Sequence, residues 1–559
     1  MAHLSRQSTG HSSHLSGPPS DLSRQSSGHS SQDSIPSSYG STGHDLYQQL
    51  SMRIVKCDKA METQALSRVK FLPRDAVDEV ITTGVVNSQL TWLPWPFSKS
   101  CDPAEAKEVK NLLAILGLCG MEKDFRDLFN EGVRDKHLPL ARRNSRGYCN
   151  DLLSPAGDEF KTFSKRKNYE SRVDEFLDKQ WQVLAPVLTT SNRDIYLDGE
   201  YPLPFYDIKK ISALNLNNTV YKGMLHAAHI IPQPSNNIEV AIKDYKDKKD
   251  FDKEKDNLLK IQNLNHPHLI RHIATIEQVQ GNIFCVIFPW ANGGNLAEFW
   301  ERFPNGNQTR SPKLFIWSLQ QMFGLVDAMF ALHDMNYRHG DLKPENILHF
   351  KDSSESSFRE SKLGTLVIAD VGVSKLHHLA TGLRGYGTDT KATTPCYEAP
   401  EAELDNNKQK KDRKSRSRRY DMWSIGCIFM EFAIWLLYGH KAIDNFKHQR
   451  KQTENDPRAH MAAYYTRTGD TAIINSAVSK GLKALENDPR CAKGTGLESL
   501  INLIEKDLIV IDPDQRIKAE SLRDKVGSIV QRAEKDSAYL MRRTEPPPRV
   551  PRPFGEDYG

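Results

Sequence analysis

The sequence lacks the features that mark several broad classes of protein. Its eight cysteines are scattered over 559 residues, with no CxxC pair and no pair of histidines near them. We therefore expect neither a disulfide framework nor a zinc site, and a reducing compartment suits such a chain. The N-terminus is polar and serine-rich, without the apolar core of a signal peptide. We expect a cytoplasmic or nuclear protein.

Long apolar runs and a strong net charge are also missing. The longest apolar run, residues 425–438, contains Glu431 and is shorter than the ~18 residues that a membrane span needs. We expect a buried helix there and no membrane association. The net charge of +5 does not point to a nucleic-acid binder. With 559 residues, the chain is long enough for more than one domain.

The two ends of the chain have compositions typical of disorder. Residues 1–45 are rich in Ser, Gly, His and Gln and hold few large apolar side chains. They contain a repeated Leu-Ser-Arg-Gln-Ser, which is either low-complexity drift or a pair of phosphorylation sites at Thr9 and Ser27. Residues 533–559 include a proline-rich stretch, so we expect an extended, disordered tail.

Residues 46–200 are expected to form a globular, mainly helical region. Asp102-Pro103 is a helix start signal, because the aspartate can cap the helix and the proline fits its first position. Apolar residues then recur at helical spacing, and no catalytic constellation is present. Basic clusters at 142–146 and 161–167 are either a solvated face or a surface for a protein partner.

The residues that could carry chemistry lie in four short motifs. Asp341, Lys343 and Asn346 place an acid, a base and an amide on one loop. Asp370-Val-Gly follows twenty-nine residues after Asp341, behind an apolar run that predicts a strand. An Ala-Pro-Glu motif begins twenty-nine residues later, and upstream Lys243 ends the apolar run Val-Ala-Ile. Four motifs in this order are far more specific than any one of them.

In these motifs the chain resembles eukaryotic-type protein kinases over residues 205–532. The resemblance implies an α+β, bilobal protein kinase fold, with a small β-rich lobe and a large helical lobe, preceded by the mainly helical region 46–200. A helical leader joined to a kinase domain is similar to an expanded group of fungal protein kinases. The pattern resembles the serine/threonine type of protein kinase, because a lysine, Lys343, follows Asp341 by two residues and a threonine, Thr394, precedes the Ala-Pro-Glu motif.

The resemblance also implies roles for these residues around ATP and Mg²⁺. Asp341 would accept or orient the proton of the substrate hydroxyl, and Lys343 would neutralise the γ-phosphate during transfer. Asn346 and Asp370 would hold Mg²⁺, while Lys243 would pair with the α- and β-phosphates. Phosphoryl transfer depends mainly on positioning and charge neutralisation, and this set supplies both.

The helix expected after Lys243 offers two candidates for the partner of that lysine. Glu254, Leu258 and Ile261 recur at helical spacing, which puts Glu254 on the buried face. The stretch that follows is longer than in the family pattern, so Asn257 is the alternative partner.

The phosphate-binding loop departs from the family pattern. Val220 matches the valine of that loop, but the three glycine positions hold Ala213, Asn215 and Asn218. Glycine lets the backbone approach phosphates and adopt positive φ, and asparagine tolerates this better than alanine does. We expect a loop that still covers the nucleotide but grips it less well.

Residues 288–291 would form the hinge that contacts adenine. Phe288 would close the pocket behind the base. The carbonyl of Pro289 and the N–H of Ala291 would bind the base, and proline can supply a carbonyl although it has no N–H.

Two further departures bear on regulation. Gly340 stands where the family has an arginine that binds a phosphate on the activation loop. Phosphorylation of Thr388 or Thr390 is therefore not expected to switch the enzyme on. Val371 replaces the usual phenylalanine after the metal-binding aspartate. The Lys- and Arg-rich stretch 402–420 is a solvated loop, a nuclear-import signal or a dock for acidic substrates.

The leading interpretation is a serine/threonine protein kinase that uses ATP and Mg²⁺. The alternative is a pseudokinase or scaffold with weak nucleotide binding that acts through residues 46–200. A nucleic-acid binder, based on the basic stretch alone, is a distant third. The resemblance further implies two structural contacts, one from Asp421 to the catalytic-loop backbone and one between Arg516 and Glu401.

Overall fold

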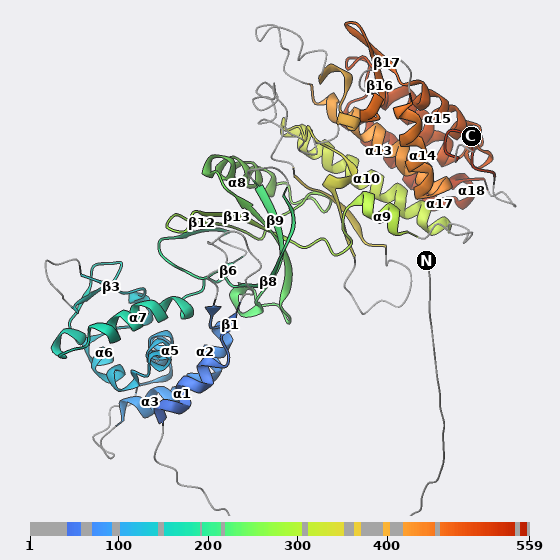
Figure 1. The fold of residues 1–559 in the computed structure, drawn as a ribbon. Helices are drawn as coiled ribbons and strands as arrows, with labels where there is room; N and C mark the ends of the chain where they lie inside the picture. The colour runs from blue at the N-terminus through green and yellow to red at the C-terminus, as the bar shows by residue number, and fades with distance from the viewer. Residues whose placement is uncertain are drawn as a thin grey trace, which may run out of the picture.

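The computed structural model places most of the chain in three successive regions (Figure 1). It describes residues 42–56, 70–91, 101–143, 150–189, 193–213, 218–303, 311–351, 363–370, 395–402, 417–452, 459–542 and 548–555. Several expectations fall outside these residues, namely those for residues 1–41, Asn215, Val371, Thr388, Thr390, Thr394 and the basic residues at 403–416.

The first region is mainly helical, as expected, and is built around α5 (Lys110–Cys119). Every residue from Leu112 to Cys119 is buried, so this helix is the centre of the region's core. The surrounding helices are α1 (Thr42–Ser51), α2 (Arg74–Val80), α3 (Thr83–Leu90), α4 (Pro103–Lys107), α6 (Phe125–Glu131) and α7 (Glu170–Val183). Short strands accompany them: β1 (Val55–Lys56), β2 (Lys70–Phe71), β3 (Ala141–Arg142), β4 (Leu152–Leu153), β5 (Glu159–Phe160) and β6 (Leu188–Thr189).

The start signal at Asp102 produces only the short helix α4, whose first-turn N–H groups donate to the Asp102 carboxylate. A second helix, α5, then begins at Lys110. There the carboxylate of Asp135 accepts the N–H groups of Asn111 and Leu112, each at 2.9 Å. Burial raises the pKa of Asp135 to about 6, against the lowering effect of these hydrogen bonds. A side chain distant in sequence therefore caps the central helix.

The second region is a six-stranded sheet with α8 (Lys248–Gln262) beside it (Figure 1). The strand order is β7-β12-β13-β11-β9-β8, and every pair is antiparallel except β7–β12. Side chains alternate along β11, so Val240 and Ile242 enter the core on one face while Lys243 points toward α8 on the other. The strands are β7 (Asp194–Leu197), β8 (Phe205–Ala213), β9 (Asn218–Leu225), β11 (Ile238–Tyr245), β12 (Ala274–Gln278) and β13 (Ile283–Pro289), with the short β10 (Ile230–Ile231) between β9 and β11.

The small lobe begins before residue 205, the boundary that the sequence suggests. Strand β7 lies within 46–200, yet it pairs in parallel with β12, with Asp194 opposite Thr275. Its four residues, Asp-Ile-Tyr-Leu, are too few to be recognised as a strand on their own. Only pairing with β12 makes them one.

The third region is helical and is organised around α13 (Arg419–Tyr438), which is buried from Tyr420 to Leu437. Its other helices are α9 (Leu296–Arg302), α10 (Pro312–Asp334), α14 (His440–Lys451), α15 (Ser476–Glu486), α16 (Gly496–Leu503), α17 (Ala519–Lys535) and α18 (Ser537–Leu540). Two hairpins complete the described part, β14 (Ile347–Phe350) with β15 (Thr365–Ile368), and β16 (Tyr465–Thr468) with β17 (Thr471–Ile474).

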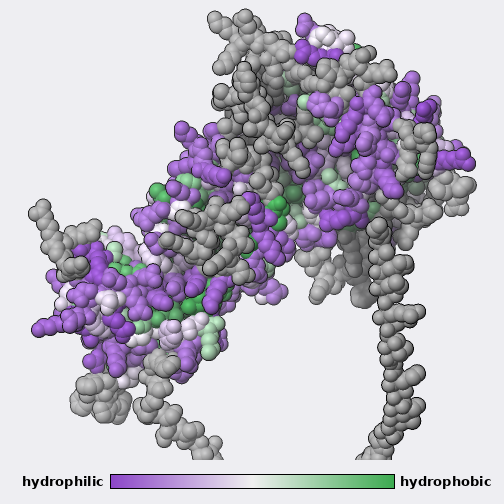
Figure 2. Space-filling model, in the orientation of Figure 1, coloured by the Kyte–Doolittle hydropathy of each residue, from purple (hydrophilic) through white to green (hydrophobic). Residues whose placement is uncertain are grey.

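Two described helices, α10 and α13, are long and apolar enough to cross a membrane by length and composition. The apolar window of α13 is 100% buried inside the protein and that of α10 is 61% buried. Both therefore act as core helices of the large lobe, which agrees with the buried helix expected at 425–438. The visible face of the molecule is mostly hydrophilic, with small separate apolar patches (Figure 2).

The tail expected to be disordered, 533–559, is ordered over much of its length. Helix α17 continues to Lys535 and α18 follows it. Farther on, Phe554 is 1% exposed and stacks on Tyr438, with ring centroids 5.2 Å apart. The Phe554 ring and a hydrogen bond from the Asn445 amide to the Phe554 carbonyl oxygen, at 3.0 Å, hold this segment against the large lobe.

The helical region is attached to the small lobe through Phe71 and His229. The Phe71 ring packs edge-on against the rings of His226 and His229. Nε2 of His229 accepts the Arg74 N–H at 3.2 Å, and Nδ1 lies 3.1 Å from the Pro186 carbonyl oxygen. This pattern fits a neutral imidazole that donates from Nδ1, and burial lowers the pKa of His229 to about 4.

Candidate active site

Lys243 contacts two carboxylates, one from the small lobe and one from the large lobe. Its Nζ lies 2.8 Å from Oδ1 of Asp370 and 3.4 Å from Oε1 of Glu254. The three side chains come from β11, from the segment after β15, and from α8. Residues far apart in the sequence therefore meet around one ammonium group.

Glu254, one of the two candidate partners of Lys243, is placed by the packing of α8. Phe251 and Leu258 on the same helix are buried against Phe284 and Val286 of β13. Because Glu254 shares that face, it is turned toward the sheet and is itself buried. The apolar contacts thus bring a carboxylate to the lysine.

The charges of this group are mutually dependent. Burial opposes the charge on Lys243, but the carboxylates of Asp370 and Glu254 outweigh it and raise the pKa of the lysine. The nearby Lys243 ammonium in turn lowers the pKa of Asp370. Lysine and aspartate are therefore both ionised at neutral pH. Asp370 adopts a left-handed backbone conformation, with φ of 57°.

The catalytic-loop candidates form a second group. The Asn346 amide nitrogen donates to the Asp341 carbonyl oxygen at 2.7 Å and to Oδ2 of Asp341 at 3.2 Å. Nζ of Lys343 lies 3.3 Å from the same Oδ2. Both neighbours contact the same carboxylate oxygen of Asp341, and neither of these contacts involves Oδ1.

The two groups are joined through the residue before Asp370. The Ala369 N–H donates to the Asn346 carbonyl oxygen at 2.9 Å, and the Ala369 carbonyl lies 2.8 Å from Nε2 of His339. Lys243, Asn346 and Asp370 thus belong to one connected arrangement rather than to separate faces of the molecule.

Asp421 holds the catalytic loop from below, as the resemblance implies. Its Oδ2 accepts the His339 N–H at 2.9 Å and its Oδ1 accepts the Gly340 N–H at 2.8 Å. His333 lies 2.8 Å from Oδ2. Burial would raise the pKa of Asp421, but the hydrogen bond from His333 and the charges nearby lower it overall. Gly340 has φ of 80°, a conformation that glycine adopts without strain.

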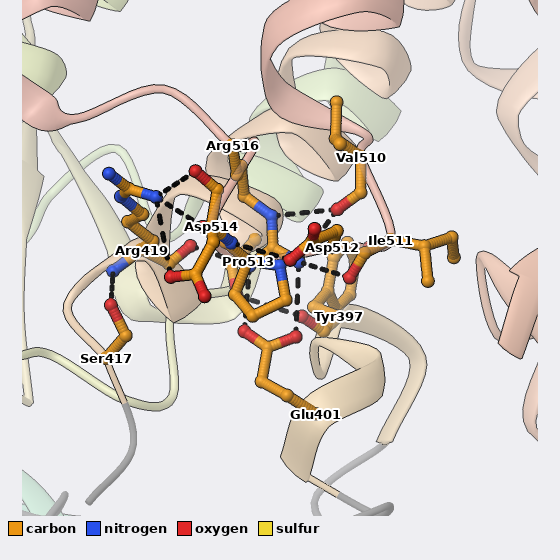
Figure 3. Close-up of polar contacts among 11 residues, drawn as sticks. Tyr397, Glu401, Ser417, Arg419, Val510, Ile511, Asp512, Pro513, Asp514 and Arg516 are labelled. Carbon is orange, nitrogen blue, oxygen red and sulfur yellow. Dashed lines mark hydrogen bonds and ion pairs between the residues drawn. The ribbon is translucent and has the colours of Figure 1, made fainter. Parts of the chain in front are cut away.

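The second expected support, Arg516 with Glu401, is bidentate (Figure 3). Nη1 and Nη2 of Arg516 lie 2.8 and 3.1 Å from the two carboxylate oxygens. Further donors of Arg516 bond to the carbonyls of Val510 and Arg419. The arginine side chain is fully buried, and these contacts occupy its guanidinium.

The nucleotide-side candidates lie on neighbouring strands. Val220 of β9 is opposite Lys243 in the register of β11, and Asn218 is opposite Tyr245. Ala213 ends β8 opposite Thr219, so these two strands would cover the phosphates beside the lysine. Asn215, between the strands, is outside the described residues.

The hinge candidates lie at the end of β13, which includes Phe288 and Pro289, and in the two residues that follow it. The Trp290 N–H bonds to Glu239 on β11, so the backbone groups of Pro289 point to the opposite side. On that side β12 begins at Ala274, which is opposite Ile287, so it does not reach Pro289. The N–H group that proline lacks would therefore have had no partner in the sheet. Ala291 follows and is buried.

One buried network, around Glu431, was not predicted from the sequence. Glu431 of α13 receives hydrogen bonds from Arg450 at 3.0 Å, Tyr464 at 2.9 Å and Tyr397 at 2.7 Å. Tyr397 lies just before the Ala-Pro-Glu motif, so the network anchors that segment. A charged residue inside an otherwise apolar run was the available signal, because a buried carboxylate needs partners.

A divalent cation would depend on Asp370 and Asn346. The amide nitrogen of Asn346 is committed to Asp341, so its amide oxygen is the atom left for a metal. A carboxylate and an amide oxygen suit Mg²⁺, which completes its shell with water and phosphate oxygens. Among the described residues, no group of three or more His, Cys, Asp or Glu side chains could hold a metal alone. The donor set therefore fits a cation that arrives with a nucleotide.

Known proteins share this arrangement of motifs. The family described as "Protein kinase domain" matches residues 226–526, more than half of the chain. The chain is 26% identical over 247 residues to CBL-interacting serine/threonine-protein kinase 21 of Arabidopsis thaliana, covering 43% of this chain and 50% of that protein. It is 29% identical over 178 residues to calcium/calmodulin-dependent protein kinase cmkA of Emericella nidulans, covering 31% and 35%.

A similar match is found to probable serine/threonine-protein kinase fhkD of Dictyostelium discoideum, with 28% identity over 174 residues, 30% of this chain and 20% of that protein. The chain spans half or less of the length of these three relatives. Family membership implies ATP as the phosphoryl donor and a divalent cation beside it. With its family match, its bilobal fold and its connected charged groups, the chain belongs to the protein kinase family.

Proposed function

We propose that this chain is an active serine/threonine protein kinase, which transfers the γ-phosphoryl group of ATP to a hydroxyl of a protein substrate with Mg²⁺ as the metal. The observation that supports this most is the meeting of Lys243 with Asp370 and Glu254, beside the loop that carries Asp341. An intact set of charges favours catalysis, because phosphoryl transfer requires positioning and neutralisation of charge.

Each described side chain has a role in this proposal. Lys243 neutralises the α- and β-phosphates, and Glu254 holds the lysine in place. Asp370 and the amide oxygen of Asn346 hold the metal, which supplies positive charge to the phosphates when bound. Oδ1 of Asp341 accepts or orients the proton of the substrate hydroxyl. Lys343 neutralises the γ-phosphate as it moves.

Serine/threonine specificity is supported by sequence. Lys343 stands two residues after Asp341, which is the pattern of the serine/threonine type. The relatives named above carry serine/threonine or calmodulin-dependent kinase names. We also propose that the protein is cytoplasmic or nuclear.

The proposal is tested by the rate of phosphate transfer from radiolabelled ATP to a generic serine- and threonine-containing protein. We expect the full-length chain to label the substrate and Asp341→Asn to reduce the rate by about 100-fold or more. Equal labelling by the two proteins would reject the proposal in favour of a scaffold. Labelling of tyrosine alone would reject the serine/threonine assignment.

A further inference from the structure

Helix α8 carries Glu254 to Lys243, and what holds this helix to the sheet therefore bears on the site. Two lysines on its outer side, Lys248 and Lys255, are seven residues apart, which is about two helical turns. They lie on one side of the helix. Each reaches a carboxylate on the sheet, one on the edge strand β7 and one on its neighbour β12.

The first contact lies within the small lobe itself. Nζ of Lys248 is 2.6 Å from Oε1 of Glu277 on β12. This pair fixes the N-terminal end of α8. It uses only residues inside the segment that matches the kinase family.

The second contact is made by a residue outside that segment. Nζ of Lys255 lies 3.5 Å from Oδ1 of Asp194 on β7. Oδ1 of Asp194 also accepts the hydroxyl of the buried Thr275 at 2.6 Å. The carboxylate is therefore held in place by β12 while it faces the helix. Lys255 is the direct neighbour of Glu254.

The position of Asp194 is fixed by contacts at both ends of β7. The Thr275 N–H donates to the Arg193 carbonyl at 2.7 Å, and Arg193 donates to the His272 carbonyl at 2.9 Å. At the other end of β7, the side-chain amide of Gln278 bonds to the carbonyls of Gly199 and Tyr201. Each end of β7 is therefore hydrogen-bonded to the small lobe.

We propose that Asp194 is a positioning residue for phosphoryl transfer, which holds α8 through Lys255 so that Glu254 stays at Lys243. The inference rests on the proposed kinase function. Within the family-matched segment, α8 is held by the Lys248–Glu277 pair and by apolar packing on β13. Strand β7, which lies outside that segment, adds a contact at Lys255 in the middle of the helix, next to Glu254. Asp194 touches neither nucleotide nor substrate in this proposal.

The test compares full-length variants in steady-state kinetics and in hydrogen exchange of the α8 amides. Asp194→Asn keeps an oxygen for the Thr275 hydroxyl but removes the charge that attracts Lys255. We expect kcat/KM for ATP to fall about two- to fivefold, since a partly exposed ion pair contributes little more than that. We expect the KM for ATP to rise, the KM for the protein substrate to stay unchanged, and exchange in residues 250–262 to speed up.

Three further variants separate positioning from a general loss of fold. Asp194→Glu should restore the wild-type KM for ATP. Asp194→Asn combined with Lys255→Gln should be no worse than either single change, because both remove the same pair. Asp250→Asn is the control, since it removes an acidic charge from the first turn of the same helix and breaks the pair with Lys253 at 3.6 Å, but leaves the Asp194–Lys255 pair intact.

The outcomes distinguish this inference from the proposed function. If Asp194→Asn matches Asp250→Asn in both the KM for ATP and the exchange of α8, the positioning role is wrong. If the wild-type chain is no faster than Asp341→Asn, the proposed kinase activity is wrong. Exchange of α8 still decides the role of Asp194 in that case, because it needs no turnover.

Discussion

Nζ of Lys243 lies 2.8 Å from Oδ1 of Asp370, although 127 residues separate the two along the chain. The contact crosses from the sheet of the small lobe to the segment that follows β15 in the large lobe. A nucleotide bound at this point would have a cation from one lobe and an anion from the other on either side of its phosphates.

Removal of the lysine should therefore abolish most of the activity. We expect Lys243→Met to slow phosphate transfer by about 100-fold or more, and Glu254→Gln to slow it by about tenfold. Initial rates at saturating ATP would measure both. Lys249→Met is a suitable control, because this lysine is exposed on α8, the helix that carries Glu254. Similar losses for Lys249→Met and Lys243→Met would contradict the site.

Asn346→Ala should change the dependence on the divalent cation. The substitution removes the amide oxygen that we assign to the metal and frees the Oδ2 of Asp341 from one donor. We expect the concentration of Mg²⁺ for half-maximal rate to rise about tenfold, measured by titration at constant free ATP. An unchanged Mg²⁺ dependence would argue against Asn346 as a metal ligand.

Breaking the buried pair of Arg516 and Glu401 should destabilise the large lobe. Loss of one partner leaves the other charged and buried, which costs about 3–5 kcal/mol of the free energy of unfolding. Denaturant unfolding of Arg516→Met against wild type would measure this. The double variant with Glu401→Met should lose less than the sum of the single changes. A loss below about 1 kcal/mol for Arg516→Met would contradict the structural role.

Acid should weaken the attachment of the helical region through His229. Its folded-state pKa of about 4 lies below the usual value of 6.5, so the unfolded chain binds a proton first as the pH falls. The contribution to stability is complete above pH ~6.5 and is lost between there and pH ~4, on the order of 3 kcal/mol in all.

His229→Asn removes this titration. The stability difference between wild type and variant should therefore shrink as the pH falls through that window, as measured by denaturant unfolding at several pH values. A difference that is constant from pH 7 to pH 4 would show that His229 does not titrate as its burial requires.

The motifs of the site could be predicted because they are local. Asp341, Lys343 and Asn346 share one loop, and their contacts with one another are set by a few residues of backbone. The long helices α10 and α13 could be predicted as well, since apolar residues recur at helical spacing along α10 and form a nearly continuous run in α13. Glu254 was identified as a candidate from helical spacing alone, and it lies at Lys243.

Features that depend on tertiary contacts could not be predicted. Strand β7 is too short to be seen without β12, and α5 is capped by Asp135 from a later segment. The charge of Glu431 pointed to a buried partner, but no local pattern identifies Arg450, which lies 19 residues away on another helix. Such pairs are set by the packing of helices rather than by neighbours in sequence.

The packing of Phe554 on the large lobe limits how far the C-terminus can be truncated. Its ring covers Tyr438 and also lies 5.8 Å from the ring of Phe446. A truncated chain that stops at Leu540 would expose both aromatic rings to solvent. The exposed apolar patch would favour aggregation. Recombinant versions of this kinase should therefore keep the chain through Gly555.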